Sequence, residues 1–504
     1  MHNNSSYFFT EEHQLFREGL RRFLEKEVVP HIDTWEKEGR IPKEIWKKMG
    51  AQGYFGLHFS EAYGGSEADF WYSVVFLEEL ARCYSGGFAI APTAHLYMAS
   101  AYLANVGSEF LKQKYLTKAI AGEWIASIAI TEPSAGSDVA NIRTTARREG
   151  DFYIVNGSKI FITNAVYGDF LITVVKTNPE KGTAGVSLLV IDRHAEGVSA
   201  NKLNKLGWHA SDTAELYFDN VKVPVENLIG EEGKGFYYLM GGLQLERLVG
   251  AVGAVAGAEF ALQHTLQYMS EREAFGRKIN QFQVLRHRIA DLASQIEATK
   301  YFIYHVCRLH NDKQYAVKEA SMAKLLATEL SDKTMYQCLQ MFGGYGYIED
   351  YKIARMFRDS RIGTIGGGTS EIMREIIAKM VVDDVQYQSA MGHSGDSAAA
   401  NPSNEKASLQ DLTQLIGNKL AGNSKKIGNT IKFVFGEQGV LFLDGLNNTV
   451  SNDDLQADCT VKIDLSDFKA LMGGKLNPMN AMMSGKLQID GDMSVAMKLQ
   501  TVFN

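Results

Sequence analysis

The sequence predicts a multidomain protein, with a helical domain, a β domain and a second helical domain followed by a tether and a small α+β domain. Three observations predict this order. The 504 residues are enough for about three folding units at roughly 150 residues each. The spacing of apolar residues changes from helical to strand-like and back along the chain. The composition then changes abruptly near residue 400.

Two helical domains are predicted, over residues 8–125 and 235–385. In the first, apolar residues recur at helical spacing, as Phe16 and Leu20 do, and Pro30 interrupts the pattern. In the second, one helix face carries apolar residues at steps of four, three and four, namely Leu285, Ile289, Leu292 and Ile296.

A β domain is predicted between them, over residues 126–234. Its apolar runs are short and bounded by turn residues, as at 170–175 and 186–191. Runs of this length and setting are typical of buried strands.

A flexible tether is predicted over residues 386–407, which are rich in Ser, Ala, Gly and Asn and lack periodic apolar residues. The last 100 residues contain no Arg or Trp but six of the 18 methionines, so residues 408–504 are expected to fold as a separate domain. Val461 and Ile463 alternate with polar residues, which predicts a half-buried strand.

Composition excludes several classes of protein. The formal charge is −7 and no basic run is interleaved with aromatics, so a nucleic-acid partner is not expected. No apolar run reaches the length of about 18 residues that a transmembrane segment needs. No export signal is visible, and the four cysteines lack metal-ligand or disulfide spacing. We therefore expect a cytoplasmic protein with buried thiols.

Common catalytic motifs are missing from the sequence. There is no GxGxxG after a strand, no P-loop, no HExxH and no GxSxG. The usual signatures of nicotinamide dinucleotides, nucleoside triphosphates, zinc and a serine nucleophile are therefore absent, and no metal is expected.

Two polar blocks in the β domain are candidates for ligand binding. Residues 131–138 read TEPSAGSD and residues 156–164 read NGSKIFITN. Hydroxyls and glycines at strand ends can donate hydrogen bonds to a flat polar ring or a phosphate, although a plain turn would look similar.

Four further blocks follow in the second helical domain. They are Glu246-Arg247, the segment 272–277 with Gln283, the segment 340–346, and the segment 366–371 that reads GGGTSE. In this order and spacing, the blocks resemble the acyl-CoA dehydrogenase family over residues 8–385. The resemblance implies FAD, an N-terminal α-helical domain, a middle β-barrel-like domain and a C-terminal four-helix bundle. It also implies a homodimer or homotetramer in which neighbouring subunits complete each flavin site.

The resemblance assigns FAD contacts by matching positions. Thr131 and Thr163 would contact the flavin ring, with Phe161 against it, and Ser137 would lie by the pyrophosphate. The adenosine diphosphate half would be held by Arg272, Phe275, Gln283, Gln340 and Gly344, and Thr369 and Glu371 would complete its site. A structural alternative stays open for single members, since Phe161 and Phe275 could be core aromatics, Gln283 a surface residue and 343–344 a helix-ending turn.

The family removes hydrogen from Cα and Cβ of an acyl-CoA thioester, and a glutamate takes the α proton. In many members this glutamate lies where the present sequence has Gly367. A second group, with long-chain and isovaleryl-type enzymes, places it on a helix directly before an arginine, which matches Glu246 and makes Arg247 a supporting residue. The backbone N–H of Gly367 would hold the thioester carbonyl, and the missing side chains at Gly366 and Gly367 would suit long or branched acyl chains. Alternatively, Glu246 is a structural partner of Arg247 or of another nearby cation, and the enzyme has lost dehydrogenation.

The tail, from Ser408 to Phe503, resembles the sterol carrier protein type two family, in segments such as 457–461 and 485–489. That family implies a five-stranded sheet, helices and a hydrophobic tunnel for acyl chains or sterols. Four methionines could line this tunnel or fill the core, namely Met472, Met479, Met482 and Met483.

The expected function is thus an FAD-dependent acyl-CoA dehydrogenase with a tethered lipid-binding domain. The family expectation for the electron acceptor is an electron-transfer flavoprotein. Two alternatives remain, a lipid-transfer protein whose dehydrogenase-like part is an inactive scaffold, and an acyl-CoA oxidase.

Overall fold

The computed structural model divides the chain into two compact units, Met1–His393 and Ser394–Asn504. It describes residues 7–385 and 387 of the first unit. In the second unit it describes residues 409, 413, 416, 428–447, 449–465, 467–468 and 487–491. The three dehydrogenase-like regions predicted from the sequence therefore pack together as one unit.

The first helical region packs its helices around a core of aromatic and aliphatic side chains. Thr10 begins the first helix, since its side chain accepts a hydrogen bond from the backbone N–H of His13. A π-helical turn, Ala94–Ser100, joins two helices into one continuous run. The helices are α1 (Glu11–Glu27), α2 (Ile32–Glu38), α3 (Lys43–Ala51), α4 (Phe70–Leu80), α5 (Gly86–Thr93), α6 (Ala101–Val106), α7 (Glu109–Leu111) and α8 (Thr117–Ile120).

The β region forms an eight-stranded sheet with the order β6-β7-β3-β2-β4-β5-β8, and β1 pairs with β4. The barrel expected from the resemblance is not closed, because β6 and β8 end the sheet without pairing with each other. β2 and β4 pair only at Thr145 and Lys176, and buried side chains from the strands on both sides of this junction share one core. The strands are β1 (Ala126–Ala129), β2 (Thr145–Glu149), β3 (Phe152–Thr163), β4 (Phe170–Lys176), β5 (Val186–Asp192), β6 (Val198–Lys202), β7 (Thr213–Pro224) and β8 (Leu228–Ile229).

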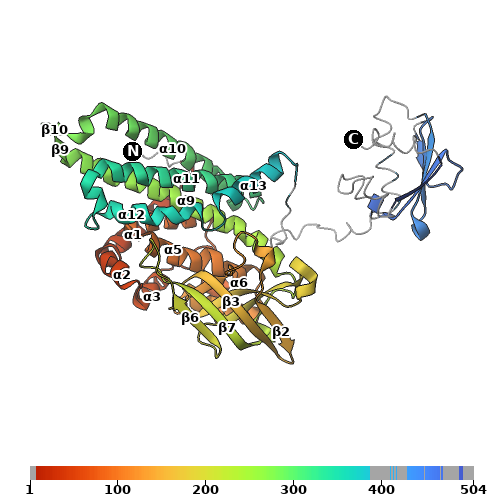
Figure 1. The fold of residues 1–504 in the computed structure, drawn as a ribbon, viewed down its shortest axis with the longest axis horizontal. Helices are drawn as coiled ribbons and strands as arrows, with labels where there is room; N and C mark the ends of the chain where they lie inside the picture. Colours follow the sequence, from red (N-terminus) through yellow and green to blue (C-terminus); the bar gives the residue numbers. More distant parts are fainter. Residues whose placement is uncertain are drawn as a thin grey trace. The chain divides into compact units, whose positions relative to one another are not determined.

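The second helical region is built around one long central helix, α9 (Gly235–Glu271). It contacts α4 and α6 of the first region, β5 of the sheet, and its own neighbours α10 and α11. A helix surrounded in this way must be apolar on most sides, which its many buried alanine, valine and leucine residues provide. The other elements are a hairpin of β9 (Glu273–Ala274) and β10 (Arg277–Lys278), α10 (Gln283–Asn311), α11 (Val317–Phe342), α12 (Lys352–Ser360) and α13 (Ser370–Val381), and Figure 1 shows the hairpin at one end of the helical layer.

The second unit contains a five-stranded sheet with the order β13-β12-β11-β14-β15, in which only β11 and β14 pair parallel. The predicted strand at Val461 and Ile463 is confirmed, since both side chains are buried. Met472, Met479, Met482 and Met483 lie outside the described residues. The strands are β11 (Thr430–Val434), β12 (Val440–Asp444), β13 (Thr449–Ser451), β14 (Cys459–Ile463) and β15 (Leu487–Gly491).

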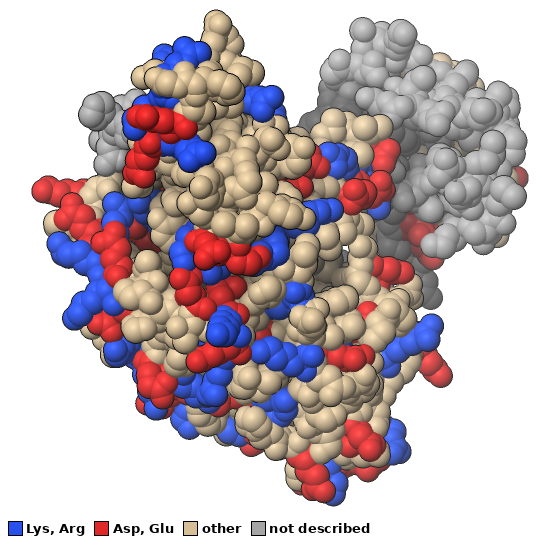
Figure 2. Space-filling model, turned by 60° about the vertical axis from the view of Figure 1, so that its left-hand side comes forward, with Lys and Arg blue, Asp and Glu red and all other residues tan. Residues whose placement is uncertain are grey.

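The described residues were expected to hold no membrane span and no metal site, and to bury their cysteines. None of the helices described there is both long and apolar enough to cross a membrane. No group of three metal-ligating side chains occurs among them. The four cysteines are buried, as predicted. Figure 2 shows side chains of both charges interspersed on one face of the molecule.

Candidate active site

A buried ion pair holds the two polar blocks of the β domain together. The Lys159 ammonium lies 2.8 Å from a carboxylate oxygen of Glu132, and both side chains are excluded from solvent. Glu132 also accepts the backbone N–H of Thr144 at 2.9 Å, while Lys159 donates to the carbonyl of Ile130 at 3.0 Å. Burial opposes ionisation, yet Lys159 still lowers the pKa of Glu132. The clamp is therefore ionic.

This clamp places Thr131 beside the end of β3. The backbone N–H of Ile160 donates to the Thr131 carbonyl at 2.8 Å, and Thr163 ends the strand, half-buried, paired with Thr213. Phe161 lies between them at a break in the β3–β7 register, with φ of 64° and 67% of its side chain exposed. A core aromatic would be buried in an extended strand, so that alternative is wrong for Phe161 in the single chain. Thr131 is therefore joined to β3 at Ile160, next to Phe161 and three residues before Thr163.

Ser137 and its neighbours lie on the exposed loop that follows Thr131. The structure gives Ser137 no hydrogen bond to another side chain, within the described part of the chain. Ser137 is an exposed residue, six positions after Thr131.

Glu246 lies in the first half of α9 and is 7% exposed. The Tyr102 hydroxyl donates to its Oε1 at 3.1 Å. Burial raises the pKa of Glu246 to about 7, although Tyr102 and Arg247 act in the opposite direction. A carboxyl whose pKa lies near neutrality can both accept and release a proton at working pH.

Arg247 is also buried, and its guanidinium contacts the Gln244 side chain at 3.4 Å. Within residues 7–385, no carboxylate lies within 4.0 Å of it, so Glu246 and Arg247 do not form an ion pair. No direct contact therefore supports the alternative in which Glu246 is a structural partner of Arg247.

Lys324 of α11 binds the triple-glycine loop and lies within the electrostatic influence of Arg247. Its ammonium donates to the carbonyl of Gly368 at 2.5 Å, and burial, followed by the charge of Arg247, lowers its pKa to about 8. Gly367 is exposed with φ of 65°, and no atom lies within 4 Å of the place where a Cβ would stand. The loop is thus held at Gly368 and open at Gly367.

Thr369 and Glu371 begin α13. The Thr369 side chain accepts the backbone N–H of Ile372 at 3.3 Å, which caps the helix. Hydrogen bonds from its own backbone N–H and from Thr369 lower the pKa of Glu371, which is exposed in the first turn. Both residues have a structural task in the single chain.

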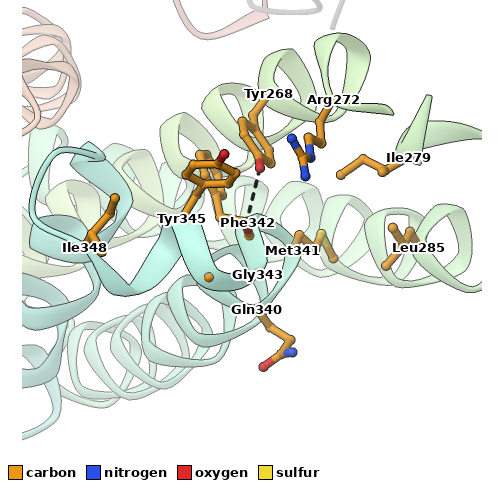
Figure 3. Close-up of a pocket in the computed structure, with 11 residues that line it drawn as sticks. Tyr268, Arg272, Ile279, Leu285, Gln340, Met341, Phe342, Gly343, Tyr345 and Ile348 are labelled. Atoms are coloured by element: carbon orange, nitrogen blue, oxygen red, sulfur yellow. Dashed lines mark hydrogen bonds between the residues drawn. The ribbon is translucent and has the colours of Figure 1, made fainter. Parts of the chain in front are cut away.

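A separate pocket of about 480 Å³ lies where α9 and α11 end, and it brings together Arg272, Gln340 and Gly344. In Figure 3, Tyr268 stacks on Phe342, with ring centres 4.0 Å apart, and its hydroxyl donates to the Phe342 carbonyl. The Arg272 guanidinium lies 5.2 Å from the centre of the Tyr345 ring. The pocket therefore offers a cation among aromatic faces.

Phe275 and Gln283 do not line this pocket. Phe275 occupies the turn of the β9–β10 hairpin with φ of 50° and is 96% exposed, which excludes the core alternative in the single chain. Gln283 is the exposed first residue of α10, next to Phe282, whose ring lies 6.1 Å from that of Phe275. Both residues lie at the hairpin end of the helical layer.

The base and the pocket lie far apart within one chain. Glu246 and Arg272 flank most of the length of α9, which places them about 39 Å apart at 1.5 Å per residue. This separation is longer than one extended dinucleotide. A ligand bound beside Glu246 therefore cannot also reach the Arg272 pocket of the same chain.

Comparisons with known proteins give the family. The acyl-CoA dehydrogenase N-terminal, middle and C-terminal domain families match residues 10–123, 127–221 and 233–382, and the SCP-2 sterol transfer family matches residues 397–504. The chain is 42% identical to a mitochondrial long-chain specific acyl-CoA dehydrogenase of Sus scrofa, over 75% of this chain and 88% of that protein. The chain belongs to the acyl-CoA dehydrogenase family. It also carries an SCP-2 domain.

Solved structures agree with this assignment. The acyl-CoA dehydrogenase of Geobacillus kaustophilus matches with a TM-score of 0.73 and 46% identity, over 74% of this chain and 99% of that chain. A chain in the structure of an electron transferring flavoprotein of Acidaminococcus fermentans matches with a TM-score of 0.72 and 36% identity, over 76% of this chain and 100% of that chain.

FAD is the cofactor of acyl-CoA dehydrogenases, and the residues present fit it. A flat ring needs an exposed aromatic face, which Phe161 provides. A diphosphate needs a cation without a carboxylate partner, and Arg272 makes no ion pair in the part of the chain that the structure describes. Gly343 and Gly344 have open space around them, so a ligand can approach the backbone there.

Sequence reasoning missed three supporting contacts of this dehydrogenase. Glu132 and Lys159 lie inside blocks that were singled out, yet nothing in their spacing indicates a pair. Lys324 and Tyr102 lie in helices without any motif. Each of these contacts joins residues far apart in the sequence, so only the fold reveals them.

Proposed function

We propose that this dehydrogenase removes the α proton of a fatty acyl-CoA with Glu246 as general base, which leads to a trans-2-enoyl-CoA product. The observation that carries the proposal is a buried carboxyl with a raised pKa near 7, on a central helix and without an ion-pair partner. Burial strengthens such a base because it removes the water that would stabilise its charge. At neutral pH the carboxyl is then ready to accept a proton.

A bound FAD would supply the acceptor for the β hydrogen, which leaves as hydride. Thr131, Ser137, Phe161 and Thr163 are proposed to hold its ring half. The exposed ring of Phe161, and the hydrogen bond that joins Thr131 to the neighbouring Ile160, support this. The adenosine diphosphate half is proposed to rest on Arg272, Phe275, Gln283, Gln340, Gly344, Thr369 and Glu371.

A homodimer or homotetramer is proposed, and the length of α9 supports it. Because about 39 Å separate Glu246 from Arg272, the Arg272 pocket is proposed to serve the flavin of a neighbouring subunit. The exposed Phe275 beside that pocket supports an interface at the hairpin.

The substrate is proposed to be a long or branched acyl-CoA. The open space at Gly367 supports this, since no side chain closes the loop there, and the relative from Sus scrofa is named for long chains. The Gly367 N–H is proposed to hold the thioester carbonyl, and Arg247 to support Glu246.

A lipid ligand and an electron acceptor complete the proposal. The SCP-2 domain is proposed to bind the lipid or acyl-CoA and so raise its concentration at the dehydrogenase, with Met472, Met479, Met482 and Met483 as tunnel lining. An electron-transfer flavoprotein is proposed as electron acceptor, supported by the matching chain in the Acidaminococcus structure. The cytoplasmic location stays a prediction.

The test is an anaerobic titration of Glu246→Gln with palmitoyl-CoA while the flavin absorbance is followed. The variant should keep FAD and lose flavin reduction by about 10²–10⁴-fold, the usual contribution of a positioned base. Glu259→Gln is the matched control, because Glu259 lies on the same helix and pairs with Lys300 at 2.6 Å. Bleaching of Glu246→Gln at the wild-type rate would contradict the proposal.

A further inference from the structure

Among the residues that the structure describes, Tyr102 is the one side chain of the first helical region that donates a hydrogen bond to the Glu246 carboxyl. It belongs to α6, its ring is buried, and its hydroxyl donates to Glu246 Oε1 at 3.1 Å. The same hydroxyl lies 3.4 Å from the Leu239 carbonyl, about two α9 turns before Glu246. The contact joins residues 144 positions apart, so only the packing of α6 against α9 creates it.

Gly242 makes room for this phenol. A Cβ at Gly242 would stand 2.3 Å from the Tyr102 hydroxyl oxygen and 2.5 Å from the ring carbon that carries it. Gly242 and Glu246 are four residues apart on α9, so they share one helix face. A glycine inside a helix costs about 1 kcal/mol relative to alanine, and here that glycine leaves the space that the phenol occupies.

Only one oxygen of the Glu246 carboxyl is engaged. Oε1 accepts the Tyr102 hydroxyl, while Oε2 receives no hydrogen bond from the residues that the structure describes. Because the phenol fixes Oε1, the carboxyl has one preferred orientation and its second oxygen is available.

We propose that Tyr102, seated over Gly242, is a positioning residue that orients the Glu246 carboxyl so that Oε2 faces the α proton of the substrate. The inference rests on the proposed function, in which Glu246 is the base. It adds an element of the N-terminal helical domain to the catalytic step, through Glu246 and without contact to the reacting atoms.

Two titratable groups act on the Glu246 carboxyl in the described structure, Tyr102 from α6 and Arg247 from its own helix. Both favour the ionised form against the effect of burial. Burial also raises the pKa of Tyr102 well above its ordinary value, so the phenol stays a donor at neutral pH. Removal of the hydroxyl should therefore raise the pKa of Glu246 further, because the carboxylate loses its donor.

The experiment compares Tyr102→Phe with wild-type holoenzyme in the pH dependence of kcat/KM for palmitoyl-CoA. The acid limb should move to higher pH by about one unit, which is the size expected for one lost hydrogen bond to a carboxylate. At neutral pH, kcat should fall about tenfold while KM changes little, because the substrate itself loses no contact.

Tyr97→Phe is the matched control. Tyr97 is another fully buried tyrosine of the same helical run, and it stacks on His58 instead of reaching Glu246. Its pH profile should equal that of the wild type. Gly242→Ala is a second test, since the added Cβ displaces the phenol and should move the acid limb in the same direction as Tyr102→Phe. The double variant should shift no further than the larger single shift.

An unchanged pH profile and kcat in Tyr102→Phe and in Gly242→Ala would overturn the inference. Glu246→Gln separates this failure from that of the base. If Glu246→Gln abolishes flavin reduction while both other variants behave as wild type, only the positioning role is wrong. If Glu246→Gln still reduces its flavin, the base itself is misassigned and the inference falls with it.

Discussion

Glu132 and Glu246 are two buried glutamates with opposite electrostatic settings. Their exposures are 5% and 7%, so burial alone does not distinguish them. Glu132 forms an ion pair with a lysine and accepts hydrogen bonds from backbone N–H groups, and its pKa is lowered. Glu246 receives one phenol and no ion pair, and its pKa is raised to about 7. The number and charge of the donors therefore decide which carboxylate is structural and which is available for proton transfer.

The largest effect should come from breaking the Glu132 clamp. Lys159→Met leaves a buried carboxylate without its cation, which should lower the free energy of unfolding by about 3–5 kcal/mol. It should also weaken FAD binding, because the clamp holds Thr131 beside Phe161. Urea unfolding followed by tryptophan fluorescence measures the first unit alone, since residues 386–504 contain no tryptophan.

Lys278→Met provides the comparison for that measurement. Lys278 pairs with Glu273 at 2.8 Å, but both side chains are well exposed, so the expected loss of stability is far smaller than that of Lys159→Met. An equal effect of the two substitutions would show that burial does not matter to the clamp.

The pH dependence of stability should have opposite signs for the two glutamates. The Glu246 carboxyl has an ordinary pKa of 4.5 and a folded pKa of about 7, so the folded chain keeps a proton that the unfolded chain has released. Its contribution to stability is therefore present at low pH and is lost as the pH rises from 4.5 to 7, by about 3 kcal/mol. Glu132, whose pKa is lowered, contributes stability above its ordinary pKa and loses it as the pH falls.

Unfolding free energies of Glu246→Gln and Glu132→Gln between pH 4 and 8 test these signs. The Glu246→Gln variant should gain stability relative to wild type as the pH rises. The disadvantage of Glu132→Gln should shrink as the pH falls. If the unfolding free energies of wild type and both variants changed with pH in parallel, the opposite signs proposed for the two glutamates would be wrong.

The sequence predicts those features of the protein that depend on local patterns. The order of helical and strand regions and the position of Glu246 before Arg247 follow from local patterns, because apolar spacing and motifs are local. The open sheet was not predicted, since closure depends on whether β6 meets β8 and not on either strand alone. The Tyr102 contact was not predicted either, because no local pattern connects α6 to α9. Contacts between distant segments are the part that needed the structure.

The smallest effect should come from Phe161, where an exposed residue takes part in the proposed flavin site. Its φ of 64° is unfavourable for a bulky side chain and ordinary for glycine. Because its side chain is 67% exposed, little packing is lost on removal. Phe161→Gly should therefore change the free energy of unfolding of the apoprotein by no more than about 1 kcal/mol in either direction. FAD affinity should fall at the same time, as measured by flavin fluorescence on titration. A large loss of stability with unchanged FAD affinity would instead make Phe161 a structural residue, and the proposed ring contact would be wrong.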